Sequence, residues 1–152
     1  MKMLRKPQVN AVIISGVSVF YAFIFILTSH HAEFERMLNH PSTLSSSFWN
    51  IWSIFLKQGN LKYIGFCYIA LTLAIVVLSF IRKREYDEYQ TSILEKGFII
   101  MSIVMVLLFP VAFILILSDS NYAIETIIFL VVTHWSTVLI AQFVYAVKYS
   151  KL

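Results

Sequence analysis

The feature that most constrains this chain is a charged segment, 82–96 (RKREYDEYQTSILEK), between two long apolar runs. The segment carries four basic and four acidic residues, and an apolar run of about 20 residues lies on each side of it. A helix of about 20 apolar residues matches the thickness of a bilayer's hydrocarbon core, where charged side chains are costly. We therefore predict that both runs cross a membrane and that 82–96 lies at the water's edge.

The rest of the chain extends this pattern. Hydrophobic residues make up 59% of the 152 residues and charged residues 13%, about half the charged fraction of a typical soluble domain. The run after the basic residues Lys2, Arg5 and Lys6 is longer than a signal-peptide core and lacks a small-residue cleavage site, so it predicts an uncleaved helix. We predict one all-α domain, 1–152, in which four transmembrane helices form a bundle, at about 9–29, 61–81, 97–117 and 123–147.

A shorter helix is predicted at about 47–57 (SFWNIWSIFLK). Its polar residues recur every three or four positions, which gives a narrow polar stripe, and Gly59 can end it. Eleven residues are too few to span a bilayer, and tryptophans such as Trp49 and Trp52 favour the headgroup zone. We expect an interfacial helix anchored by these tryptophans, lying on the bilayer or as a lid over the bundle.

The distribution of lysine and arginine predicts the orientation. With four spans, both termini and 82–96 share one side, which holds nine of the twelve Lys and Arg residues. Cytoplasmic loops carry an excess of these residues. We therefore predict a multi-pass protein of the cell membrane with cytoplasmic N- and C-termini and an extracytoplasmic 30–60 connection.

Several classes of function are disfavoured or excluded by the composition. The +4 net charge arises from residues that flank apolar runs, which indicates contact with anionic lipid headgroups and not nucleic acid. Cys67 is the only cysteine, which excludes an intramolecular disulfide and the membrane thiol oxidoreductases that need cysteine pairs. The first apolar run lacks the carboxylate of small multidrug exporters, and 63–81 lacks the charged residues of the membrane glutathione and eicosanoid enzymes.

Two of the predicted spans carry faces of small residues. Small side chains let a neighbouring helix approach closely. The faces consist of Ala11, Ser15, Ser18 and Ala22 in the first span, and of Thr126, Thr133, Thr137 and Ala141 in the fourth.

The fourth span also holds the chain's intramembrane polar candidates, which are Glu125, His134, Thr137 and Gln142. Polar residues inside a membrane are functional candidates by default. We expect His134 to form a hydrogen bond with another helix, and a role in proton or ligand binding remains the alternative. Glu125 and His134 are nine residues apart, on opposite faces of one helix, so they cannot form a relay within it.

A second set of candidates lies in the 30–60 connection, where His30, His31, Glu35 and His40 are potential metal ligands. On a helix, His31 and Glu35 would be one turn apart and could share a divalent ion. A solvated connection that happens to contain these residues is the alternative. We predict no cofactor.

The charged segment itself offers a possible contact surface for a partner, formed by Glu85, Asp87, Glu88 and Gln90. The spacing of Arg84 and Glu88, four residues apart, predicts that the second span continues as a helix beyond 81. A solvated helical hairpin is the alternative interpretation.

The motif Asp87-Glu88-Tyr89-Gln90, followed by Ile93 and Lys96, resembles a group of uncharacterised small four-helix integral membrane proteins of Gram-positive bacteria. These proteins carry an acidic D-E-x-Q-type loop between their second and third helices. The resemblance covers about residues 80–147 and implies a bacterial cytoplasmic membrane without an assigned activity.

Three functions remain open. The first is a non-enzymatic accessory, regulatory or immunity-type protein that acts through helix–helix contacts with another membrane protein or in a homo-oligomer. The second is a small transporter or pore subunit that uses Glu125, His134 and Gln142. The third is a membrane enzyme with an extracytoplasmic metal site at His30, His31, Glu35 and His40. Because no catalytic set is evident, we expect the first.

Overall fold

A computed structural model describes residues 6–41, 46–82 and 85–149. These residues form helices joined by short connections, as predicted for an all-α chain. The four long helices are α1 (Pro7–Thr28), α4 (Leu61–Ile81), α5 (Glu88–Ser118) and α6 (Ala123–Tyr149). Each is long and apolar enough to cross a membrane. Lys2, Arg5, Lys83, Arg84 and Lys151, which entered the charge count, lie outside the described residues.

Three short helices complete the described chain. The predicted helix at 47–57 is present as α3 (Ser47–Lys57). Before it lies α2 (Ala32–Leu38), which the sequence analysis did not predict, and a turn of 3₁₀ helix, η2 (Ser120–Tyr122), precedes α6. Gly59 ends the α3 region with φ +68°, a left-handed conformation that glycine adopts without strain.

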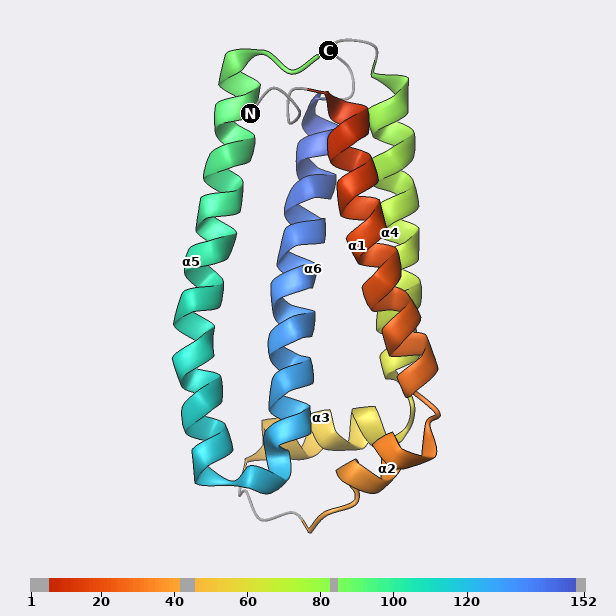
Figure 1. Cartoon of the computed structure of the whole chain (residues 1–152), viewed down its shortest axis with the longest axis vertical. Helices are drawn as coiled ribbons and strands as arrows, with labels where there is room; N and C mark the ends of the chain where they lie inside the picture. The colour runs from red at the N-terminus through yellow and green to blue at the C-terminus, as the bar shows by residue number, and fades with distance from the viewer. Residues whose placement is uncertain (1–5, 42–45, 83–84, 150–152) are drawn as a thin grey trace.

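The long helices lie side by side, and the short ones gather at one end (Figure 1). α1 packs along α4, α6 packs against both α4 and α5, and α5 lies on the far side of α6. α1 begins, α4 passes to α5 and α6 ends at one end of the molecule, which we call the terminal end. α2 and α3 lie at the other end, the α2–α3 end, where α3 runs across the direction of the long helices.

The start of α5 lies inside the charged segment, before the predicted third span. α5 begins at Glu88, nine residues before the predicted residue 97. The reason is a capping box, in which Asp87 Oδ1 accepts from the Gln90 backbone N–H at 2.7 Å and Gln90 Oε1 accepts from the Asp87 N–H at 3.2 Å. The predicted helical continuation of the second span is wrong, because α4 ends at Ile81 and 85–87 are not helical.

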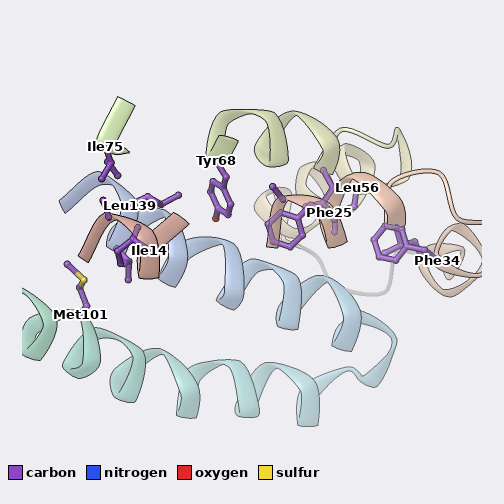
Figure 2. Close-up of a cluster of buried hydrophobic side chains, with 13 residues drawn as sticks. Ile14, Phe25, Phe34, Leu56, Tyr68, Ile75, Met101 and Leu139 are labelled. Carbon is purple, nitrogen blue, oxygen red and sulfur yellow. The ribbon is translucent and has the colours of Figure 1, made fainter. Parts of the chain in front are cut away.

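A buried apolar cluster joins all six α-helices (Figure 2). Ile14 and Phe25 of α1 and Tyr68 of α4 belong to it, and Phe34 of α2 and Leu56 of α3 close it at the α2–α3 end. α5 contributes Met101, which reaches toward Ile14 and Leu139. Met101 is the one buried residue of α5 between 98 and 118, so α5 is held far less deeply than α1 and α4.

The small-residue face of the first span is used inside the molecule. Ala11, Ser18 and Ala22 are fully buried. At Gly65 of α4, an added Cβ would lie 3.0 Å from the Ala22 carbonyl oxygen and 3.1 Å from Ile26 Cγ1. The backbones of α1 and α4 therefore approach closely at Gly65, which is the role small residues play in membrane helix pairs.

This contact generates a stability prediction. Gly65→Leu must push α1 and α4 apart, and overpacking of this kind costs about 1–3 kcal/mol. Gly16→Leu is the matched control, since a Cβ at Gly16 meets nothing within 4 Å. Thermal unfolding in detergent, followed by circular dichroism, should show a lower midpoint for Gly65→Leu only. Equal midpoints for the two variants would contradict the packing described.

Candidate functional site

A buried carboxylate, Glu125, organises the α2–α3 end. Its side chain is 0% exposed. Glu125 Oε1 lies 2.8 Å from His40 Nε2 and accepts a hydrogen bond from Ser53 Oγ at 3.0 Å. Trp52 Nε1 donates to the backbone oxygen of Glu125 at 2.9 Å. We call Glu125, His40, Ser53 and Trp52 the Glu125 cluster. It joins the start of α6 to α3 and to His40, which follows α2 in the chain.

The second nitrogen of His40 is also engaged. His40 Nδ1 lies 3.1 Å from the Pro41 carbonyl oxygen, which can only accept, so a hydrogen bond here requires the hydrogen on Nδ1. The His40 ring is therefore held at both nitrogens, by the adjacent backbone and by Glu125.

Aromatic side chains hold the cluster in place. The Phe129 ring of α6 lies 5.3 to 5.8 Å from the rings of Phe48, Trp49 and Trp52, all in edge-on orientations. The Tyr122 ring lies 4.6 Å from the His40 ring. Such edge-on pairs stabilise beyond the area they bury. α3 is thus fixed on α6 by the two predicted anchor tryptophans together with the Glu125 cluster.

Two polar atoms at this end have no partner within the described residues. Glu125 Oε2 and Thr126 Oγ1 are both buried and make no hydrogen bond. A buried carboxylate oxygen left in this way is costly unless an internal water reaches it. The chemistry that this arrangement offers is the hydrogen bonding of a buried carboxylate to His40 and Ser53.

The predicted metal ligands do not come together. His40 bonds to Glu125, whereas His30 Nε2 accepts a hydrogen bond from Lys62 Nζ at 2.9 Å. His31 and Glu35 are exposed. Glu35 lines an open hollow of about 530 Å³ with Arg36 and Lys57, whose positive charges would repel a metal cation. Within the described ranges, no three His, Cys, Asp or Glu side chains lie close enough to hold a metal ion.

Comparisons with protein-family models, with curated proteins and with solved structures find no match to this chain.

A second buried polar group lies at the terminal end and centres on Arg82, which is 5% exposed. Its guanidinium donates to the Tyr149 carbonyl oxygen and, at 2.8 Å, to Gln90 Oε1. Gln8 Nε2 donates to the Arg82 carbonyl oxygen at 3.1 Å. Arg82, Gln90, Tyr149 and Gln8, the Arg82 cluster, therefore join all four long helices. The positive charge also meets the negative end of the α6 dipole.

The Arg82 cluster changes the interpretation of the charged segment. Gln90, a predicted partner residue, is buried, and its backbone oxygen accepts from Tyr145 OH at 2.7 Å. Asp87 caps α5, while Glu85 and Glu88 are exposed. The Tyr86 ring lies 4.7 Å from the guanidinium carbon. Burial raises the pKa of Tyr86, the Arg82 charge opposes part of that rise, and the ring stays neutral at physiological pH. Half of the predicted partner surface thus serves the fold.

The other intramembrane candidates lie apart from each other. Gln142 Oε1 accepts a hydrogen bond from Asn10 of α1 at 2.9 Å, and both side chains are buried. Thr137 Oγ1 donates to the Thr133 carbonyl oxygen of its own helix. His134 Nδ1 is buried without a hydrogen-bond partner among the described residues, so the expected bond to another helix is not seen at this nitrogen. Among the described residues, no hydrogen bonds connect Glu125, His134 and Gln142 into one polar path.

Four members of the two clusters were not among the predicted site residues, namely Ser53, Arg82, Gln8 and Tyr149. Ser53 belonged to the polar stripe of 47–57, and its inward position could have been inferred from the facing Trp49 and Leu56 three or four residues away. Arg82 was taken for a topology residue, and no local sequence signal distinguishes a buried arginine from the adjacent basic residues.

The Glu125 cluster predicts that Glu125→Ala and Glu125→Gln lower the stability of the protein by different amounts. Glu125→Ala leaves His40 and Ser53 buried without their acceptor, which costs about 1–3 kcal/mol. Glu125→Gln retains an oxygen for Ser53 and should cost less. Glu35→Ala, an exposed carboxylate on α2, should have no effect. Thermal unfolding in detergent measures the order, and faster hydrogen exchange in α2 and α3 of Glu125→Ala should accompany it. Equal unfolding midpoints for Glu125→Ala and Glu35→Ala would show that the cluster does not contribute to stability.

Proposed function

We propose that this protein spans the cell membrane four times, as a helical bundle with both termini and the α4–α5 connection in the cytoplasm. Three observations support this placement. α1, α4, α5 and α6 are long and apolar enough to cross a membrane. α1 begins and α6 ends at the end of the molecule that carries the 82–87 connection (Figure 1). Nine of the twelve Lys and Arg residues belong to that side.

We also propose that α3 lies in the headgroup zone. Its inward residues are Trp49, Ser53 and Leu56, whereas Phe48, Ile51 and Ile54 are at least half exposed. A helix that faced water would carry polar residues there. An exposed apolar row beside anchored tryptophans is typical of a helix that lies at the membrane interface.

The function supported best is that of a non-enzymatic accessory protein, which binds a transmembrane helix of another membrane protein through α5. The polar groups of the two clusters bond within the protein and hold its own helices together. The small-residue face of α1 packs inside the protein, with Ala22 against Gly65 of α4 and Ser18 bonded to Trp135 of α6. Apolar side chains are exposed on all four long helices, and α5, which packs mainly on α6, is the least buried of them.

One observation carries the proposal, a groove of about 370 Å³ on α5. It is bordered by two rows of side chains spaced four residues apart, Phe98–Ser102–Val106 and Ile99–Ile103–Leu107. Rows of this spacing are the ridges between which a second helix inserts its own ridge. Ser102 has the smallest side chain of the six, so the centre of the groove is the least filled by side chains. Its hydroxyl donates a hydrogen bond to the Phe98 carbonyl oxygen, which leaves the surface of the groove apolar. A transmembrane helix has the complementary shape and polarity.

The transporter and metal-enzyme alternatives have weaker support. A transport pathway needs polar groups that connect across the membrane. Glu125 instead bonds to His40, and Gln142 bonds to Asn10. A metal centre needs three or four converging ligands, and the predicted ligands lie apart.

The test is photocrosslinking in the native membrane. A photoreactive phenylalanine analogue at Ile103, inside the groove, should form an adduct with one membrane protein. The same analogue at Phe113, equally exposed on α5 but outside the groove, should not. Filling the groove with Ser102→Leu should reduce the Ile103 adduct at least tenfold.

The contrary outcomes are distinct. Adducts of equal yield from both positions, or an Ile103 adduct that Ser102→Leu does not reduce, would show unspecific collision. An adduct of twice the chain's mass would show a homo-oligomer in place of another protein. No protein adduct from Ile103 would mean that lipid covers the groove and would refute the proposal.

A further inference from the structure

A second hollow lies between α5 and α6 at the terminal end. Its volume is about 370 Å³. Leu94, Gly97 and Met101 of α5 line one wall, and Ala141, Val144 and Lys148 of α6 line the other. Because two helices border it, this hollow is a crevice within the protein and is distinct from the groove on α5 alone.

Two polar side chains in the walls of the crevice are already engaged. Gln142 Oε1 accepts a hydrogen bond from Asn10, and Tyr145 OH donates one to the Gln90 carbonyl oxygen. The remaining lining is mostly aliphatic. An occupant therefore finds apolar contact inside the crevice and little that could bind a polar group.

The rim of the crevice differs from its interior. Lys148 is the one charged side chain among the ten residues that line it, and it is exposed in the last turn of α6. Its ammonium lies 5.3 Å from the Tyr149 ring and has no carboxylate partner in the part of the chain that the structure describes. In the proposed placement Lys148 lies at the cytoplasmic surface, at the level of the lipid phosphates.

We propose that this crevice binds one anionic phospholipid of the cytoplasmic leaflet. An acyl chain lies between α5 and α6, and the phosphate pairs with Lys148. An apolar slot with a single cation at its mouth is complementary to an amphiphile with a negative head, and basic pockets between helices on this side of a membrane bind such headgroups. The proposal rests on the membrane placement above and is independent of the partner groove.

The crevice offers two variants, each with a matched control. Gly97→Leu fills it, since a Cβ at Gly97 meets only the end of the Met101 side chain, at 3.9 Å, and leucine favours a helix over glycine. Gly16→Leu, in open space on α1, is its control. Lys148→Gln removes the cation, and Lys96→Gln removes an exposed lysine that does not line the crevice.

Native mass spectrometry of the full chain in mild detergent, titrated with dioleoyl phosphatidylglycerol or dioleoyl phosphatidylcholine, tests the site. We expect one retained phosphatidylglycerol per chain, bound more tightly than phosphatidylcholine. Lys148→Gln should weaken the binding of phosphatidylglycerol about fivefold, because one lysine near an anionic surface contributes about 1 kcal/mol. Lys96→Gln should leave this binding unchanged. Gly97→Leu should abolish retention, while Gly16→Leu should preserve it. Unchanged unfolding midpoints confirm that the variants fold.

Three results would overturn the proposal. Equal retention of phosphatidylglycerol and phosphatidylcholine would show that Lys148 does not select an anionic lipid. Retention that Gly97→Leu does not affect would show that the lipid binds outside the crevice. A dimer of the chain that retains no lipid would show that a second copy covers the crevice. Because photocrosslinking from Ile103 reports on a different surface, loss of its adduct with lipid retained would refute the proposed function alone.

Discussion

Polar groups between apolar helices must find their hydrogen-bond partners inside the protein, and this constraint governs the structure. In hydrocarbon no water compensates an unpaired donor or acceptor. The chain pairs many of these groups in the Arg82 cluster at one end of its long helices and in the Glu125 cluster at the other, although Glu125 Oε2, Thr126 Oγ1 and His134 Nδ1 have no partner among the described residues. Each cluster joins segments that are far apart in sequence. Between them, apolar packing and single bonds such as Asn10 to Gln142 connect the helices.

This arrangement leaves α5 unlike the other long helices. Its first turns are fixed by the capping box and by Gln90, whereas its remaining length rests mainly on α6. A helix anchored at its end and exposed along its side suits an element that binds another helix. The same separation from α1 and α4 opens the crevice beside Lys148. Partner binding and lipid binding, as proposed, would therefore act on the same helix through different faces.

The sequence predicted the number of long helices and most of their ends, because hydrophobic runs of this length are a strong and local signal. It predicted a span from about residue 97 and, as one interpretation, a helical hairpin in the charged segment. In the structure the reciprocal bonds of Asp87 and Gln90 begin α5 at Glu88, inside that segment. From the sequence, Glu125, His40 and Trp52 have three separate predicted roles, and the structure brings them into one cluster. That convergence depends on how α2 and α3 fold back onto α6, which no local pattern encodes. The buried position of Arg82 likewise depends on tertiary contacts.

Labelling of single cysteines in intact cells tests the proposed placement in the membrane most directly. Two variants are made in a Cys67→Ser background. One carries Glu35→Cys on α2 and the other carries Glu85→Cys in the 82–87 connection, and both positions are exposed. A membrane-impermeant maleimide should label Glu35→Cys in intact cells and Glu85→Cys only after permeabilisation. Labelling of both positions in intact cells, or of Glu85→Cys alone, would contradict the four-span orientation.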